Sequence, residues 1–276
     1  MQKFFEIKSV KPEHYLQLKE LWLMCFPDEE KKVLDNFFEK SVTPQNVIAT
    51  FFGEQIVNAM CLLESEIVLK NKRYSAIYIY GVCTHPEYRG KGLMKTAFKH
   101  LDELAILKNI DYLFLVPATE GLFDMYEKLG YKTGFTHEKT AVEIDEIFST
   151  QEKSETFTFE KYLQFREKYC DDSSGYAILK GDAFKSFYFP VGEEMKVVCN
   201  SNGYCVFSVE NEKITVFEHF CKTGYKLPYH GIYNKDYFVV VRKPHSDGYG
   251  VPFGMYKSFG DTPQLEDAFF GVPYGG

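Results

Sequence analysis

Apolar side chains recur along the first half of the chain with two periods, one typical of strands and the other of helices. Runs that alternate in polarity, or are apolar throughout, predict strands at residues 4–10, 47–52, 55–63, 67–69, 74–84 and 112–116. Apolar residues three and four positions apart predict helices at residues 12–26, 29–42, 93–108 and 121–129. One or two further strands are expected before residue 148.

The strand at 74–84 is nearly all apolar from Ala76 onward, which is typical of a strand buried on both faces. A helix connects it to the strand at 112–116. Such a crossover is almost always right-handed and joins parallel strands, so these two should run parallel. The other connections favour antiparallel hairpins. The sequence therefore predicts an α+β fold with a mixed, mostly antiparallel sheet flanked by helices.

A short polar stretch at 150–155 marks the expected boundary between two domains, 1–148 and 149–276. The length of 276 residues is sufficient for two domains, since most domains contain ~100–150 residues. The second is expected to be a smaller α+β unit with a helix at 159–169. Its strands are expected at residues 176–179, 184–189, 196–199, 204–209, 214–220 and 237–241. From His245 onward the chain is rich in Gly, Pro and aromatic residues, so we expect irregular structure there.

Charge and cysteine content narrow the classes of partner. A net charge of −7 opposes phosphate backbones, so nucleic acid is not expected, whereas a cationic substrate is attracted. The seven cysteines include no CxxC pair, so we expect reduced thiols in a cytoplasmic protein and no metal site. The longest apolar run, 76–83, is far shorter than the ~20 residues of a membrane helix, so no membrane is expected. Composition leaves the oligomeric state open.

The segment that carries the chemistry runs from Val82 to Met94, where a buried strand ends and a helix begins. A glycine-containing loop before a helix presents free backbone N–H groups and the positive helix end to an anion. Arg89 and Lys91 add positive charge suited to a pyrophosphate. The same features also fit an ordinary strand-to-helix connection with solvated side chains. The residues alone leave both interpretations open.

This segment resembles the acetyl-CoA signature of the GNAT superfamily of N-acetyltransferases, Arg/Gln-x-x-Gly-x-Gly/Ala, and the order of elements is also similar. Arg89 and Gly92 match, while Met94 stands where Gly or Ala is usual, as in relatives of the enhanced-intracellular-survival aminoglycoside acetyltransferases. The resemblance implies acetyl-CoA as co-substrate. Its pantetheine arm would lie along main-chain groups of Val82, Cys83 and Thr84. Its pyrophosphate would be held by Arg89, Gly90, Lys91, Gly92, Leu93, Met94 and Lys95. A P-loop is excluded, since Gly-x-x-x-x-Gly-Lys-Ser/Thr is absent.

A second motif, at 119–131, places Tyr126 shortly before the pair Gly130-Tyr131. By the same resemblance, Tyr126 would be the general acid that protonates the departing thiolate of CoA. A nearby O–H stabilises the charge that develops in a water-excluded site. A tyrosine here also fits a purely structural role, in which its ring packs the helix against the sheet.

No single residue identifies the base that must deprotonate the incoming ammonium. Asp28 resembles a substrate-facing turn of the same subgroup, and Glu29 and Glu120 are further candidates, although each also suits a surface charge. The C-terminal carboxylate serves in some relatives and would here belong to Gly276. Cys83 lies beside the expected thioester, where either a covalent nucleophile or a buried structural thiol fits.

The second half has no further phosphate-binding loop, and it resembles the degenerate acetyltransferase-like domain of that subgroup, without the subgroup's sterol-carrier-like domain. Aromatic rings there would line the acceptor cleft or build a small core; the candidates are Tyr225, Tyr229, Tyr233, Phe253 and Tyr256. The sequence thus predicts an N-acetyltransferase that moves acetyl from acetyl-CoA directly to a primary amine of a small cationic molecule, amino acid or peptide. The alternatives are a non-catalytic acyl-CoA-binding or sensor module and an interaction module.

Overall fold

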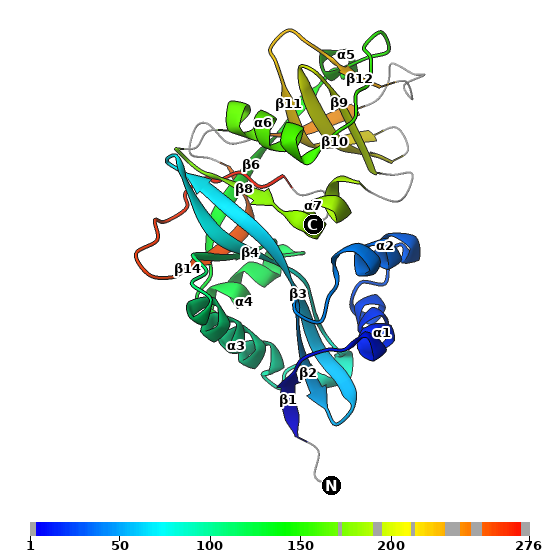
Figure 1. Ribbon diagram of the computed structural model, residues 1–276. Coiled ribbons are helices and arrows are strands. Elements are labelled where there is room, and N and C mark those ends of the chain that lie inside the picture. Colours follow the sequence, from blue (N-terminus) through cyan, green and yellow to red (C-terminus); the bar gives the residue numbers. More distant parts are fainter. Residues whose placement is uncertain are drawn as a thin grey trace.

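The computed structural model describes residues 4–170, 173–189, 195–210, 213–229, 238–243 and 250–271 (Figure 1). The strands of the first half are β1 (Phe5–Lys8), β2 (Val47–Phe52), β3 (Gln55–Leu69), β4 (Lys72–Thr84), β5 (Tyr112–Leu115), β6 (Lys132–Val142) and β7 (Phe148–Ser149). Its helices are α1 (Tyr15–Cys25), α2 (Lys31–Ser41), α3 (Leu93–Leu107), α4 (Phe123–Glu127) and α5 (Ile144–Ile147), with short 3-10 turns η1 (Pro12–His14), η2 (Pro86–Tyr88) and η3 (Glu120–Leu122).

The second half contributes two further helices and most of the remaining strands. The helices are α6 (Phe159–Tyr169) and α7 (Gly181–Tyr188). The strands are β8 (Tyr176–Leu179), β9 (Met195–Asn200), β10 (Gly203–Glu210), β11 (Lys213–Cys221), β12 (Leu227–Pro228), β13 (Phe238–Lys243) and β14 (Val251–Ser258). Within the described residues, none of these helices combines the length and the apolar character that a membrane span requires.

The predicted α+β class is confirmed by one large sheet with helices on both faces. Among the described strands, the sheet follows the path β1-β2-β3-β4-β5-β14-β6-β13-β11-β10-β9, and β8 pairs with β3. Strands β1 to β4 are antiparallel, whereas β4 and β5 run parallel, as the crossover through α3 predicts. Helices α1 and α2 lie on one side of β3 and β4, and α3 and α4 lie on the other (Figure 1).

The prediction that the chain is irregular from His245 onward is wrong, because strand β14 lies in this part of the chain. It comes from the end of the chain yet lies between β5 and β6, antiparallel to both, with Met255 opposite Leu115. Residues 253–256 are all buried, so this interior strand shows no alternation of polar and apolar side chains, and its Pro252 and Gly254 are typical of loops. A chain cut after Phe148 would leave β5 and β6 without the strand that joins them.

The second half also departs from the sequence prediction at helix α7. Residues 184–189 were expected to form a strand, but helix α7 covers this segment to Tyr188. Ala183, Phe184, Phe187 and Tyr188 are buried at helical spacing, and a short apolar run does not distinguish a buried strand from a buried helix. The predicted helix at 159–169 is confirmed as α6, and the strands predicted at 204–209 and 214–220 are confirmed as β10 and β11, which pair antiparallel.

A buried ion pair organises the core of the second half. Arg166 of α6 and Glu218 of β11 are each fully buried and contact one another. Arg166 also donates to the carbonyl oxygen of Ala177 at 2.8 Å, and the hydroxyls of Tyr188 and Tyr204 donate to Glu218, each at 2.7 Å. Burial raises the pKa of Glu218, while Arg166 opposes this effect. The network fixes α6, α7, β8, β10 and β11 relative to one another.

Candidate active site

A bulge in β4 creates the gap in which the predicted cofactor residues meet. The β3–β4 register shifts between Ala59 and Cys61, and Gly81 adopts a left-handed φ of +62° there. A Cβ on Gly81 would lie 2.0 Å from ring atoms of Trp22, so glycine is required both by the conformation and by the close approach of the ring. The pairing of β4 with β5 ends at Tyr78, so the last part of β4 leaves its neighbour. Sequence reasoning missed Gly81, because nothing in the linear pattern marks the bulge.

A cleft of about 760 Å³ opens where β4 leaves β5. Its wall is built from the end of α1, the end of β4, the following loop with the start of α3, and one side of α4. The lining residues are Cys25, Phe26, Val82, Cys83, Thr84, Tyr88, Arg89, Gly90, Gly92, Leu93, Met94, Lys95, Leu122, Met125, Lys128 and Leu129. All the predicted cofactor residues belong to this lining except Lys91, whose Nζ lies 4.5 Å from the ring centre of Tyr88.

The loop before α3 presents backbone donors to this cleft. Gly90 and Gly92 have left-handed φ values of +74° and +76°, and a Cβ at either position would meet nothing within 4 Å. These glycines are therefore needed for the backbone path and not for space. Gly92 is the N-cap of α3, and its carbonyl oxygen accepts the N–H of Thr96 at 3.1 Å. The N–H groups of Leu93, Met94 and Lys95 precede this first helical hydrogen bond and so have no helical partner, and all three residues line the cleft.

Arg89 is exposed, and its guanidinium supports the end of β4. Its Nε donates to the carbonyl oxygen of Thr84 at 3.2 Å, and its Nη2 lies 3.8 Å from Cys25 Sγ. The Cys25 thiol itself lies 3.4 Å from the same carbonyl oxygen. Asn58 of β3 holds the other side of the strand end, since its Nδ2 donates to the carbonyl oxygen of Cys83 at 2.8 Å. These contacts fix the path of β4 where the pantetheine arm is expected.

Tyr126 lies behind the wall of the cleft and not on its lining. Its side chain is 5% exposed and packs against Phe98 and Tyr131, with ring centres 5.7 Å and 6.1 Å away. Met125 of α4 and Leu129, which follows this helix, do line the cleft. Burial raises the pKa of Tyr126 to about 12, so the hydroxyl keeps its proton at neutral pH. This geometry is compatible with a structural role for the Tyr126 ring and also with a role for its hydroxyl as proton donor.

The structure does not bring the predicted carboxylates together. Asp28, in the turn between α1 and α2, and Glu120, in η3, are exposed and lie off the cleft lining. Glu29 is half-buried and faces a small pocket on the α1–α2 side of β4, lined by Trp22, Val33, Leu34, Asn36, Phe37, Tyr80, Ser186 and Phe187. Loss of solvation, with Glu30 nearby, raises the pKa of Glu29. Gly276 lies outside the described residues.

The aromatic residues that were predicted to line the acceptor cleft lie elsewhere, where the structure describes them. Phe253 and Tyr256 are buried in β14, and Tyr229 packs against Phe148 and Phe207 with ring centres 5.4 Å and 5.0 Å away. Tyr225 is exposed, and Tyr233 lies outside the described residues. Other rings from the second half do approach β4. The centre of Phe187 of α7 lies 5.1 Å from that of Tyr80, and the centre of Phe270 lies 5.0 Å from that of Tyr78.

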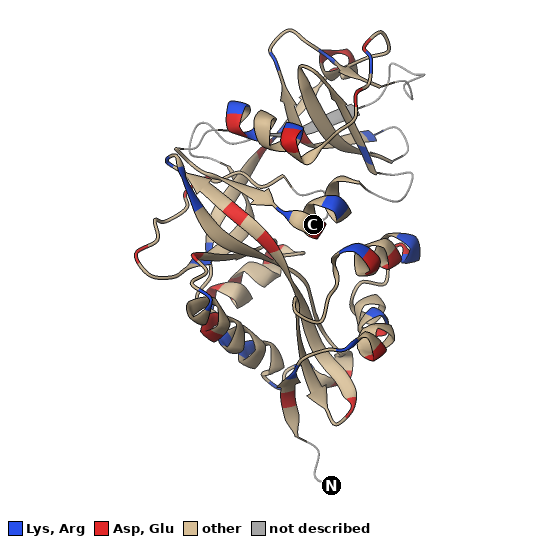
Figure 2. Cartoon of the chain, in the orientation of Figure 1, with Lys and Arg blue, Asp and Glu red and all other residues tan. Residues whose placement is uncertain are grey.

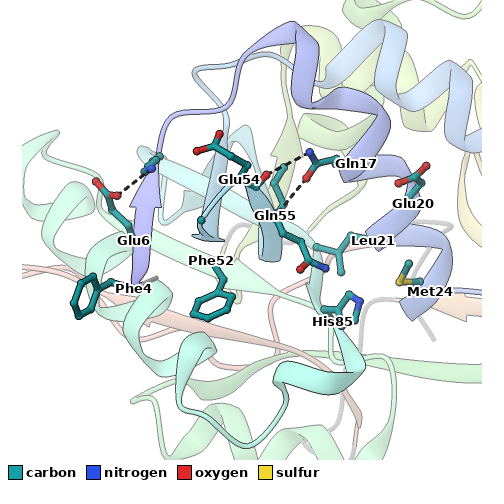
Figure 3. A pocket seen from close by; sticks show the side chains of 13 residues that line it. Phe4, Glu6, Gln17, Glu20, Leu21, Met24, Phe52, Glu54, Gln55 and His85 are labelled. Carbon is teal, nitrogen blue, oxygen red and sulfur yellow. Dashed lines mark hydrogen bonds and ion pairs between the residues drawn. The ribbon is translucent and has the colours of Figure 1, made fainter. Parts of the chain in front are cut away.

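A second large pocket, also of about 760 Å³, lies on the outer side of α1 (Figure 3). Its floor is the β2–β3 turn, which Gln17 holds by donating to the carbonyl oxygen of Glu54 at 3.4 Å and accepting the N–H of Ile56 at 3.1 Å. Glu6 and Glu20 join Glu54 on its rim, as Figure 3 shows. His85, at the start of the loop after β4, lines this pocket, whereas Tyr88, Arg89 and Gly90 further along the loop line the cleft. The loop therefore separates the pocket from the cleft. No sequence pattern predicts this pocket.

Comparisons with known proteins identify the fold. Residues 6–134 match a family model described as an acetyltransferase (GNAT) domain. No curated protein sequence matches the chain. The structure is similar to a GCN5-related N-acetyltransferase from Kribbella flavida, with a TM-score of 0.71, 15% identity and coverage of 93% of this chain and 71% of that one.

Two further structures have the same fold. One is a conserved protein of unknown function from Enterococcus faecalis, described as a probable N-acyltransferase, with a TM-score of 0.70, 13% identity and coverage of 93% and 72% of the two chains. The other is Eis1 from Mycobacterium abscessus, with a TM-score of 0.60, 9% identity and coverage of 86% and 65%. Residues 6–134 thus match a GNAT acetyltransferase domain, the described chain shares the fold of these structures, and the two findings together support an acyltransferase.

Proposed function

We propose that this acyltransferase moves an acetyl group from acetyl-CoA directly to a primary amine of a small cationic molecule, an amino acid or a peptide. The observation that carries the proposal is the cleft at the end of β4, where the freed strand edge, the glycine loop and the start of α3 meet. Its volume of about 760 Å³ is typical of small-ligand sites, which span ~300–1,000 Å³.

The residues of the cleft suit the two parts of acetyl-CoA. Free backbone N–H groups at the start of α3 and the ammonium of Lys95 fit an anionic pyrophosphate. The bulge at Gly81 leaves the main-chain groups of Val82 without a partner on β5, so they are available to amide groups of a pantetheine arm, whereas the carbonyl oxygen of Thr84 already accepts from Arg89. Apolar side chains of η3 and α4, Leu122 and Met125, are proposed to cover the hydrocarbon part of this arm.

Bound acetyl-CoA supplies the acetyl group in an activated form, as a thioester. Tyr126 is the proposed acid, because its hydroxyl stays protonated and its helix forms one wall of the cleft. Transfer to the amine is proposed to be direct. Cys83, the other candidate for a covalent step, is 3% exposed with its Sγ 3.6 Å from the carbonyl oxygen of Ala59, as a structural thiol would be.

For the amine, the structure favours Glu29 over Asp28 and Glu120. A half-buried carboxylate beside aromatic rings suits an ammonium group, which the rings attract by cation–π interaction. The raised pKa of Glu29 also suits a general base. Phe187 and Ser186 of α7 belong to the same pocket, and Ser186 Oγ lies 2.6 Å from Ser41 Oγ of α2. The second half therefore contributes to the proposed acceptor site.

Acetyl-CoA binding is tested by reversing one charge on α3. Lys95→Glu places a carboxylate beside the expected pyrophosphate, while Lys99→Glu makes the same change one turn further on, off the cleft lining. Loss of a charge-assisted contact worth about 1.5–3 kcal/mol weakens binding by about 10–100-fold. Calorimetry should show this loss for Lys95→Glu alone. Equal binding by both variants would refute the cofactor site.

Acetyl transfer is tested by a screen of amines with acetyl-CoA, followed as release of free thiol. Once an amine is found, Glu29→Gln should lower kcat/KM by at least about 10-fold, whereas Asp28→Asn, at the exposed neighbouring position, should change it little. One observation favours the alternative of a non-catalytic acyl-CoA-binding module, since Asp28 and Glu120 both lie off the cleft. Tight acetyl-CoA binding with no thiol release for any amine would establish that alternative.

A further inference from the structure

A lysine of the inserted strand β14 joins α3 to the turn that follows α4. Lys257 comes two residues after Met255, whose side chain packs in the core on the α3 side of the sheet. The Nζ of Lys257 donates to Asp102 Oδ2 of α3 at 2.6 Å and to the carbonyl oxygen of Leu129 at 3.0 Å. These partners lie 155 and 128 residues away in the sequence, so it is the insertion of β14 that brings the three groups together.

The partner of Lys257 on α3 is a partly buried carboxylate. Acidic and basic residues are interspersed along α3, as Figure 2 shows. Glu103 has a partner on the helix itself, since its Oε1 lies 3.9 Å from Lys99 Nζ in an exposed pair. Asp102 pairs instead with Lys257, and these two side chains are 24% and 23% exposed. Because water and salt screen a partly buried ion pair less than an exposed one, the link from β14 to α3 is the stronger of the two pairs.

Helix α4 depends on contacts with other elements, because it comprises only five residues. A helix this short is not stable by itself. The turn after it is bonded to Tyr126, whose carbonyl oxygen accepts the N–H groups of Leu129 and Tyr131 at 3.0 and 3.1 Å. Lys257 binds the carbonyl oxygen of Leu129, and a cation is favourable there because the end of a helix carries partial negative charge. The ammonium group therefore fixes the turn to which the proposed acid is bonded.

We propose that Lys257 is a positioning residue for acetyl transfer, which holds the end of α4 against α3 and so sets the width of the cleft and the place of Tyr126. The start of α3 lines the cleft, and so do Met125 and Leu129. This role rests on the proposed function, since it concerns acetyl-CoA and the proposed acid. It also gives the last described strand of the chain a part at the site, in addition to its part in the sheet.

Loss of the ammonium group leaves Asp102 and the carbonyl oxygen of Leu129 without this partner. A hydrogen bond to a charged group changes an equilibrium by about 10–100-fold, and the lower value applies here because the ion pair is partly exposed. The end of α4 is then free to shift away from α3, which weakens the contacts of Met125 and Leu129 with acetyl-CoA and misplaces the Tyr126 hydroxyl. The pocket proposed for the amine should not change, since no residue of α3 or α4 lines it.

Two substitutions of Lys257 and one matched control separate positioning from packing. Lys257→Met removes the ammonium group and keeps an unbranched apolar side chain. Lys257→Arg keeps a cation that can bind both partners. Lys132→Met is the control, because Lys132 lies on β6 beside β14, and its Nζ donates to Gln264 Oε1 at 3.0 Å, off the cleft lining.

The first measurement is amide hydrogen exchange of the full chain without acetyl-CoA, read by mass spectrometry of peptides. Lys257→Met should speed exchange about 10-fold in residues 123–131 and leave β4 unchanged. Lys257→Arg should recover most of the protection, and Lys132→Met should match the parent chain. Unchanged exchange of residues 123–131 in Lys257→Met would overturn the proposal.

The second measurement is steady-state kinetics with an amine that the parent chain acetylates, at a temperature where every variant is folded. Lys257→Met should raise the KM for acetyl-CoA about 10-fold and lower kcat at least about 10-fold, because small misplacements of a catalytic group are costly, while the KM for the amine holds. A merely structural role would reduce the amount of folded protein and leave both KM values unchanged, and that result would exclude positioning.

The two measurements also distinguish this proposal from the proposed function. If the parent chain neither binds acetyl-CoA nor acetylates any amine, the proposed function falls, and the exchange measurement still decides whether Lys257 fixes α4. If the parent chain is active and Lys257→Met has the same KM for acetyl-CoA and the same kcat, the proposal for Lys257 falls alone.

Discussion

Replacing Gly81 by alanine tests whether the bulge in β4 depends on the absence of a side chain. The added Cβ meets two obstacles in the folded protein. The φ of +62° is a left-handed conformation, which costs a non-glycine residue ~1–2 kcal/mol. The Cβ would also lie 2.0 Å from two ring atoms of Trp22, which is 4% exposed and packed among Phe26, Phe37, Phe38 and Tyr80. Overpacking of this kind costs ~1–3 kcal/mol.

The sum predicts that Gly81→Ala lowers the free energy of unfolding by about 2–5 kcal/mol. Gly224→Ala is the matched control, because Gly224 also has a left-handed φ, of +82°, but no atom lies within 4 Å of its Cβ position. Gly224→Ala should lower the free energy of unfolding only by the conformational part, about 1–2 kcal/mol. The difference between the two variants isolates the collision with the Trp22 ring.

Urea unfolding, followed by circular dichroism, measures both variants against the parent chain. The midpoint of Gly81→Ala should fall well below that of Gly224→Ala, and its affinity for acetyl-CoA should fall as well, since the bulge frees the edge of β4. Trp22→Leu in the Gly81→Ala background should recover part of the added loss, because it removes the colliding ring. Equal unfolding free energies for the two alanine variants would refute the close-approach argument.

Three further predictions address the proposed acid Tyr126, the buried ion pair and the inserted strand. Tyr126→Phe removes only the hydroxyl, so acetyl-CoA affinity should hold while kcat falls by about 10²–10⁴-fold; turnover within a few-fold of the parent would leave Tyr126 a structural ring. Because its pKa is about 12, Tyr126 should cause no alkaline loss of kcat between pH 7 and about 10. Glu218→Gln leaves the buried Arg166 without its counter-charge and should lower the free energy of unfolding by about 3–5 kcal/mol, read from urea midpoints; a change below about 1 kcal/mol would contradict this. A chain that ends at Phe148 lacks β14 and should aggregate in gel filtration, whereas a soluble chain with full kcat/KM would exclude any role for the second half.

The proposed cofactor residues were accessible to sequence reasoning because they are local. From Val82 to Lys95 the chain runs as a strand end, a glycine loop and a helix start, so neighbours in sequence are also neighbours in space. The left-handed backbone at Gly90 and Gly92 follows from their being glycines. The long periodic helix α3 and the strands that border it were predicted within a few residues for the same reason.

The tertiary structure decided the features that depend on residues far apart in sequence. Strand β14 has no local pattern, since the core clusters on the two sides of the sheet bury both of its faces and no polar side remains to reveal a period. Gly81 matters only because the ring of Trp22, almost sixty residues earlier, packs onto it. The position of Tyr126 behind the cleft wall, and the aromatic pocket that Glu29 shares with Phe187, likewise result from packing between distant elements. Local sequence determines backbone conformation and polarity, but which side chains meet is settled by how the sheet and helices pack.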